Sequence, residues 1–203
     1  MAKVILTESY KAISDKVNIA LSKEINKSLV KTANKIQNQI QPLIRSALLS
    51  SPEIASLRGG VLRAEFGLDN DPTITIVESI VGSIQVTAQK LTKDFKGGIQ
   101  VTMQPSSYAN LLSLPDAQQP LENGGSLPWL SWLLTLGDAI IIADFGVEFG
   151  TFPQSRTGEA RMTKNQSPYK VNSAFSGTVD NNFITRAVRE VSPRIRKIIQ
   201  GAF

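Results

Sequence analysis

The 203-residue sequence contains no histidine and no cysteine, and each absence removes a class of function. Without thiols there is no disulfide framework and no cysteine nucleophile. Without imidazole groups there is no histidine general base and no zinc site of the usual kind. Nothing in the sequence therefore places the folded chain in an oxidising compartment. Hydrolase chemistry is disfavoured, which leaves a protein that binds, assembles or carries something.

Aromatic residues make up only 6% of the chain, and long hydrophobic runs are also missing. The most apolar stretch, residues 127–143, is interrupted by Gly137 and Asp138. A membrane-spanning helix needs about 20 mainly apolar residues, and a carboxylate near its middle is unfavourable. We therefore expect a short buried helix followed by a strand, and no membrane association. The N-terminus becomes polar at Thr7 and Glu8, so we do not expect a signal sequence.

The remaining composition is that of a folded protein. Hydrophobic residues make up 41% and charged residues 19%, and 22 basic against 17 acidic side chains give a net charge of +5. Such a chain has enough apolar surface for a packed core. Its length fits a single α+β domain over residues 1–203, with a helical arm at about 9–50, a core at about 59–180 and a terminal helix at about 181–200.

Residues 9–50 carry the strongest periodic pattern in the sequence. Apolar residues recur every three or four positions, which predicts one long amphipathic helix. These positions are Val17, Leu21, Ile25, Leu29, Ala33, Ile36, Ile40, Ile44 and Ala47. We expect Pro42 to kink or restart the helix, because proline removes a helical hydrogen bond.

A row of lysines runs beside this apolar face. Its members, four residues apart and therefore in one stripe, are Lys23, Lys27, Lys31 and Lys35. The row is either a solvated flank whose side-chain stems cover the apolar seam, or an electrostatic contact with nucleic acid or an acidic partner subunit. From the sequence alone the solvated flank is the simpler interpretation.

The next part of the chain predicts a broken helix and a hairpin. The segment from Ser51 to Gly67 begins like a capped helix and is interrupted by two glycines. Residues 73–81 mix β-branched side chains with helical spacing and could form either a helix or a strand. Residues 83–88 and 99–103 alternate between apolar and polar side chains, so we expect them to pair as a hairpin.

The C-terminal half alternates short elements with loops. We expect a short helix at 105–112, a surface loop at 115–126, a helix around Trp129 and Trp132 with both side chains as core anchors, one or two strands within 139–149, and a polar loop at 152–168. Asp180 is the expected N-cap of a last helix, which Pro193 interrupts. The predicted fold class is α+β, with a long N-terminal amphipathic helix, a small mainly antiparallel sheet and a C-terminal helix.

No pattern in the chain predicts a catalytic, cofactor or metal site. A phosphate-binding loop needs the run Gly-x4-Gly-Lys-Ser/Thr, and no stretch has it. Asp69 and Asp71 lie in a predicted turn and lack the further oxygen ligands that a hard cation requires. We therefore expect a protein that is not an enzyme and that has no catalytic residue, no cofactor and no bound metal.

Basic residues gather toward the C-terminal part of the chain. They are Arg156, Arg186, Arg189, Arg194, Arg196 and Lys197, and with the lysine row they are the candidate contacts to neighbouring subunits or to DNA. Because Phe152, Tyr169 and Phe175 lie among them, these residues could form a nucleic-acid surface with stacking aromatics. A solvated face, or salt bridges to a neighbouring subunit, would use the same residues without nucleic acid.

Several runs within residues 51–190 carry a resemblance to a known class of proteins. In chain order they are residues 56–68, residues 127–138, Ser155-Arg-Thr-Gly158 with Met162, Phe175-Ser-Gly-Thr178, and residues 181–187. These runs resemble virion structural proteins of contractile-tailed bacteriophages, notably cyanophages. The arrangement of a long helix, a Leu-Arg-containing segment, a small sheet and a terminal helix is also similar to phage neck and tail-completion proteins, which form rings between the portal complex and the tail tube.

The resemblance implies a non-enzymatic virion structural protein. It would assemble in the host cytoplasm as a ring at the head–tail junction, as a neck, tail-completion or tail-terminator protein. The implied partners are further copies of itself, other phage neck and tail proteins, and packaged DNA in passing. A baseplate or tail-tube component and a DNA-binding accessory protein stay open as competing hypotheses.

Overall fold

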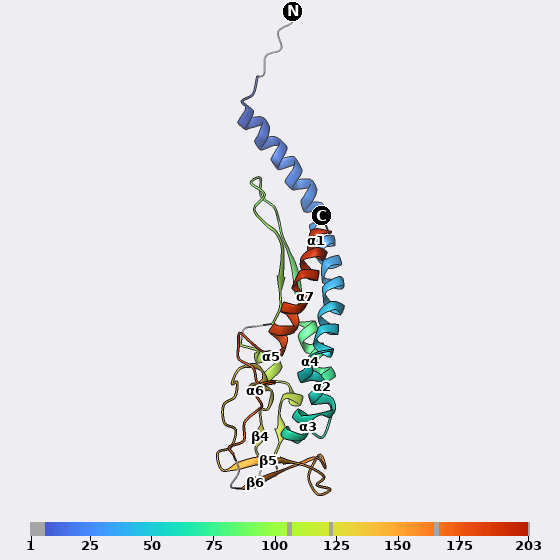
Figure 1. Ribbon diagram of the computed structural model, residues 1–203. Helices are drawn as coiled ribbons and strands as arrows, with labels where there is room; N and C mark the ends of the chain where they lie inside the picture. Colours follow the sequence, from blue (N-terminus) through green and yellow to red (C-terminus); the bar gives the residue numbers. More distant parts are fainter. Residues whose placement is uncertain (1–6, 105–106, 122–123, 165–166, 203) are drawn as a thin grey trace, which may run out of the picture.

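The computed structural model describes residues 7–104, 107–121, 124–164 and 167–202. Its α+β fold is built along one long helix, α1 (Tyr10–Leu49), with the terminal helix α7 (Phe183–Gln200) packed against it, which confirms the predicted fold class. Figure 1 shows an elongated molecule with the short helices and loops gathered at one end and the N-terminal part of α1 extending from the other.

The remaining elements are short. In chain order they are α2 (Pro52–Gly59), α3 (Val61–Phe66), α4 (Thr73–Gly82), β1 (Gln85–Gln89), β2 (Gly98–Thr102), α5 (Ala109–Leu112), a 3-10 turn (Pro115–Ala117), β3 (Gln119–Pro120), β4 (Ser126–Leu127), α6 (Leu130–Leu134), β5 (Phe145–Phe149) and β6 (Ala160–Lys164). In the described ranges the strands form three separate antiparallel pairs, β1–β2, β3–β4 and β5–β6, rather than one sheet.

Helix α1 continues through Pro42, so the expected restart at this residue is wrong. Proline removes one backbone hydrogen bond from a helix. Here the neighbouring turns are held by packing, because Ile40 and Ile44 are fully buried in the core while Pro42 itself faces solvent. The helix begins at its cap, Ser9, whose hydroxyl oxygen accepts a hydrogen bond from the backbone of Ala12 at 3.2 Å.

The last helix begins two residues later than predicted and is not interrupted. Its N-cap is Asn182 instead of Asp180, because the Asn182 side chain accepts from the Thr185 backbone while the Thr185 hydroxyl accepts from the Asn182 backbone. This capping box satisfies backbone donors that a helix start otherwise leaves unpaired. Helix α7 then runs through Pro193, whose side chain is exposed, so the predicted interruption is also wrong.

The predicted broken helix is confirmed as α2 and α3. The second of these, α3, is capped by Gly67, which has the left-handed conformation with φ of 64°. The ambiguous segment after it is the helix α4. Its start is fixed by Asp71, whose carboxylate accepts from the backbone of Thr73 at 2.9 Å. Its helical spacing buries Ile76 and Ile80 completely on one face.

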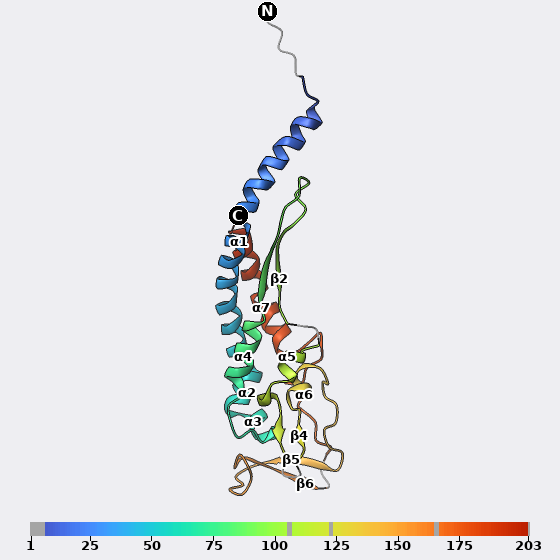
Figure 2. The same cartoon turned by 180° about the vertical axis from the view of Figure 1, so that it is seen from behind.

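The hairpin β1–β2 confirms the predicted pairing of two alternating segments. Its register places Val86 opposite Val101 and Ala88 opposite Ile99. Figure 2 shows from behind how the hairpin rises beside α1 and past the end of α7. Among the described strand pairs, it is the one that lies beside the N-terminal part of α1. From here on, the arm means only the part of α1 from Tyr10 to Ile25 and not the whole predicted segment 9–50.

Two predicted loops contain regular structure. The segment 115–126 includes the 3-10 turn and the pair β3–β4, and the polar loop at 152–168 includes β6. Strand β6 carries two cations, which obscure its strand pattern in the sequence, but it pairs with β5 along its whole length. The expected short helix at 105–112 is confirmed as α5; this segment and both loops each include two residues outside the described ranges.

The core sits at the broad end of the molecule. Trp129 is fully buried, lies 5.5 Å from the Phe66 ring between centroids, and donates through its indole N–H to the Asp116 carbonyl at 3.1 Å. Its predicted role as a core anchor is therefore confirmed. Trp132 is only partly buried and donates to the Ala139 carbonyl at 3.0 Å, so it anchors a loop at the edge of the core.

Candidate assembly surfaces

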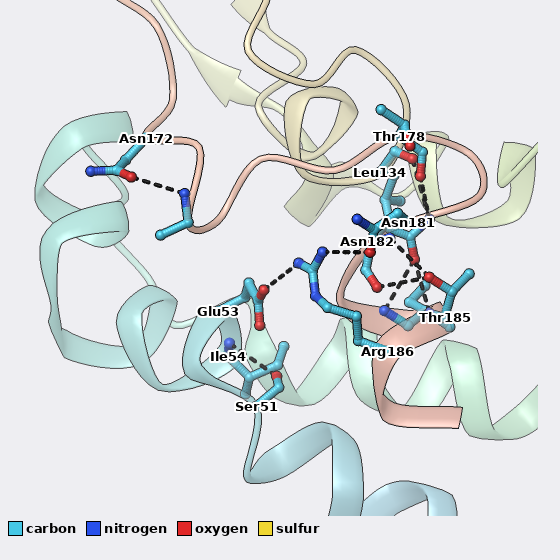
Figure 3. A network of polar contacts seen from close by, with 12 residues as sticks. Ser51, Glu53, Ile54, Leu134, Asn172, Thr178, Asn181, Asn182, Thr185 and Arg186 are labelled. Atoms are coloured by element: carbon cyan, nitrogen blue, oxygen red, sulfur yellow. Dashed lines mark hydrogen bonds and ion pairs between the residues drawn. The ribbon is translucent and has the colours of Figure 1, made fainter. Parts of the chain in front are cut away.

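The arginine at position 186, a predicted contact residue, is part of an internal network (Figure 3). It lies on the first turn of α7 and reaches α2, where its guanidinium contacts the Glu53 carboxylate at 2.5 Å. Glu53 is 2% exposed, and a buried charge needs such a partner. Arg186 also donates to Asn181 at 3.1 Å. Its charge is therefore used to hold α7 on α2 and is not free for another subunit.

Asn182 adds the second part of this network. Its buried side-chain amide lies within hydrogen-bonding distance of the Tyr108 hydroxyl at 2.9 Å and of the Thr178 carbonyl at 2.9 Å, while its amide oxygen caps α7. The first turn of α7 is thus tied to the loop before it and to the segment before α5. This tie holds the start of α7, while the rest of the helix packs along α1.

Arg156 is also engaged within the chain. Its guanidinium donates to the Pro120 carbonyl at 3.1 Å and lies 3.9 Å from the Asp69 carboxylate. These contacts hold the loop between β5 and β6 against β3. Of the C-terminal basic candidates, Arg156 and Arg186 are therefore structural in the isolated chain.

The remaining basic candidates are exposed. On α7 they are Arg189, Arg194, Arg196 and Lys197, and on α1 they are Lys23, Lys27, Lys31 and Lys35. Among the described residues only Lys27 of these has an ion-pair partner, Glu24 at 2.6 Å. Arg194 and Lys197 meet Gln39 and Ser46 at a hollow between the two helices. Lys35 lies one helical turn from Gln39, so the C-terminal end of the lysine row is near this hollow, whereas Lys23 and Lys27 line a different hollow with Lys90.

Two of the three aromatic residues that could have stacked on bases, Tyr169 and Phe152, are engaged within the chain. Tyr169 is 4% exposed, and its hydroxyl donates to the Glu65 carbonyl at 3.0 Å. Phe152 lies under the guanidinium of Arg161, 4.3 Å from its ring centroid. The stacking surface considered from the sequence is therefore not formed by Tyr169 and Phe152.

The arm carries apolar side chains that the fold does not cover. Tyr10 is 90% exposed, Val17 50% and Leu21 49%, and their spacing of seven and four residues puts them on one side of the helix. We call these three residues the arm stripe. The same sequence pattern continues into Leu29, which is buried. The apolar face is thus continuous in sequence, but only its C-terminal part has a partner within the described chain.

Within the described part of the chain, the β1–β2 hairpin has one edge covered by α1 and one open edge. On the β1 side, α1 supplies side-chain amides in place of a strand: the Gln37 carbonyl accepts from the backbone of Val86 at 3.2 Å, and Asn26 exchanges two hydrogen bonds with the backbone of Leu91 at 2.8 and 3.0 Å. Because the Val86 N–H points to α1, the pair Val86–Val101 is not hydrogen-bonded across the ladder.

By the same alternation, the backbone groups of Val101 and Ile99 point away from β1. Strand β2 contains neither a charged residue nor a proline, the residues with which proteins usually block an exposed edge. This second surface can therefore accept an extended segment from outside the chain.

Glu65 is the most unusual carboxyl group in the described structure, and nothing in the sequence marks it. Its Oε2 atom is buried without a hydrogen-bond partner, and burial raises the pKa of Glu65 from 4.5 to about 7. Burial, and then the negative charge of Glu65, raise the pKa of Tyr169 above its usual range. Glu65 lines two hollows at the broad end, of about 430 and 650 Å³. The sequence could not have identified Glu65 as unusual, because its burial depends on how α3 packs in the folded protein.

This pKa predicts how stability depends on pH. The unfolded Glu65 ionises at about pH 4.5 and the folded one at about pH 7, so the protein loses stability as the pH rises between these values. We expect Glu65→Gln to leave stability unchanged at pH 4 and to raise it by about 1–2 kcal/mol at pH 8, with allowance for solvent screening of a partly exposed group. Urea unfolding at the two pH values measures this, with exposed Glu159→Gln as control; equal effects of Glu65→Gln at both pH values would contradict it.

No group of three or more potential metal-ligating side chains occurs among the described residues. Within that same part of the chain, no helix has the length and hydropathy to cross a membrane. Comparison of the sequence and structure with protein-family models, curated proteins and solved structures gives no match. The surfaces described above are therefore the basis for assigning a function.

Proposed function

We propose that this protein is a non-enzymatic bacteriophage virion structural protein that assembles as a ring at the head–tail junction, as a neck, tail-completion or tail-terminator component. The observation that carries the proposal is the arm stripe. The N-terminal part of α1 extends from the body with large apolar side chains exposed, namely the arm stripe on one side and Ile19, 52% exposed, on another, and water is an unfavourable environment for such a surface.

A contact repeated between identical copies would remove the arm stripe of every copy from water. In a heterologous contact, the arm stripe of one copy meets a different surface of the next copy, and the contacts close into a ring if the rotation between copies allows it. The open edge of β2 lies on the same half of the molecule and offers a second contact. The location at the head–tail junction comes from the resemblance to neck and tail-completion proteins; a baseplate or tail-tube position is the competing location within the virion.

A DNA-binding accessory protein is the second candidate, and the seam between α1 and α7 favours it. Arg194 and Lys197 line the hollow between the two helices, Lys35 is one helical turn from Gln39 at the same hollow, and none of the three has an ion-pair partner among the described residues. This candidate predicts an affinity for duplex DNA whose logarithm falls linearly with the logarithm of salt concentration. Absence of binding in a gel-shift assay at low salt would exclude it.

The ring proposal is tested with purified protein and with virions. Mass photometry across a range of concentrations should show one closed oligomer, and negative-stain images should show rings. Antibody labelling of purified phage should mark the head–tail junction, and a phage without the gene should accumulate unjoined heads and tails. A monomer at every concentration, together with absence from virions, would refute the proposal.

A further inference from the structure

The larger of the two hollows beside Glu65 is a groove with a mainly apolar lining. It has a volume of about 650 Å³ and lies between the β5–β6 hairpin and the segments around α3 and α6. Three of its lining side chains, Leu121, Ile142 and Met162, are each 41% exposed although they are large and apolar. An exposed apolar groove of this size is typical of a surface that another molecule covers.

The charges around the groove are paired, with one exception among the described residues. Arg161 binds the Glu148 carboxylate at 2.9 Å, and Arg156 is held by Asp69 and the Pro120 carbonyl. Glu65 also lines the groove, but it takes part in no ion pair within the described part of the chain, and its Oε2 atom has no hydrogen-bond partner there. Glu65 as a whole is only partly buried, but a carboxylate oxygen that is buried without a partner is unfavourable, and a cationic donor would complement the group.

We infer that this groove is the docking site for a segment of another protein that carries apolar side chains and one lysine or arginine, whose cation pairs with Glu65. The apolar side chains would cover Leu121, Ile142 and Met162, and the cation would complement the one charge of the described lining that lacks a partner. Charge complementarity therefore selects a cationic segment over a neutral or acidic one.

The groove lies at the end of the molecule opposite to the arm. A contact there leaves the arm stripe and the open β2 edge free for copies of this chain. The inference thus deepens the proposed function, because it gives the chemistry of a partner that binds at the end opposite the arm. It rests on the proposed function only for the kind of protein that supplies the segment.

The test uses the full-length protein at pH 8.5 and three capped pentapeptides. Each peptide has two leucines on either side of a central residue. The central residue is lysine, norleucine or glutamate. In titrations followed by amide chemical shifts, we expect the lysine peptide to bind with a dissociation constant on the order of 1 mM, about tenfold tighter than the norleucine peptide, with shifts at residues that line the groove. The glutamate peptide should bind weakest.

The variant Glu65→Gln should remove the preference for lysine over norleucine while leaving the affinity for the norleucine peptide unchanged. This variant is expected to fold, since it removes an unfavourable buried charge. Glu159→Gln, at an exposed carboxylate outside the groove, is the matched control and should keep the preference. Equal binding of the lysine and norleucine peptides, no binding at all, or an unchanged preference in Glu65→Gln would each overturn the inference. None of these outcomes depends on whether the protein forms rings.

Discussion

For the ring assembly proposed above, replacing Leu21 by aspartate is expected to convert the oligomer to monomers. Leu21 lies in the exposed arm stripe, where a carboxylate would be buried without a partner on contact with a second copy. We expect the dissociation constant of the oligomer to rise at least about 100-fold, which corresponds to about 3 kcal/mol per contact. Mass photometry of wild type and Leu21→Asp at matched concentrations measures the change.

The matched control is Ala20→Asp. Ala20 is exposed, and its side chain points about 100° away from that of Leu21 around the same helix. The variant adds the same charge to the arm but leaves the stripe intact, so assembly should persist. Both variants should keep the wild-type unfolding free energy within about 0.5 kcal/mol because both sites are exposed. Loss of assembly in both variants, or in neither, would show that the arm stripe is not the contact.

Replacing Arg186 by methionine is expected to destabilise the folded chain itself. The substitution leaves the Glu53 carboxylate, 2% exposed, without the guanidinium that now lies 2.5 Å away. An uncompensated buried charge costs several kcal/mol, and since Arg186 is itself partly exposed we expect a loss of about 3 kcal/mol in the free energy of unfolding. Urea denaturation followed by circular dichroism measures this loss.

Arg189→Met separates this structural role from a role in contacts. Arg189 is one turn farther along α7, is exposed, and has no ion-pair partner among the described residues. Its loss should change stability by less than about 0.5 kcal/mol. If Arg186→Met proves as stable as Arg189→Met but no longer assembles, then Arg186 is a contact residue as the sequence suggested, and the internal network is not what uses it.

The periodic elements could be predicted from the sequence, and the reasons are local. The spacing from Leu29 to Ala47 predicts the buried face of α1, and the alternation around Val86 and Val101 predicts the hairpin. The misplaced boundaries arise where local rules compete. Asp180 is a good capping residue, but Asn182 is the cap because its amide can also donate to carbonyl groups of the preceding loop, which a carboxylate cannot do.

The candidate surfaces could be predicted only in part. The sequence identifies the cations on α1 and α7, but it does not show that Arg186 lies against Glu53, a residue 133 positions earlier in the chain. It also does not show where the apolar face of α1 stops being covered, because that depends on where α7 ends beside it. The groove at Glu65 was missed altogether, since a single glutamate in a short helix carries no pattern.

The amides that α1 presents to β1 have a consequence for how copies of this protein can join. A ribbon of two strands grows without limit only if each added strand leaves a new margin for the next, as happens in fibres. Here Gln37 and Asn26 already hydrogen-bond the backbone on the β1 side of the hairpin. If the added strand is β2 of a second copy, the joined ribbon has α1 along both outer edges, so strand addition ends at two copies although β2 lacks the usual protective charges.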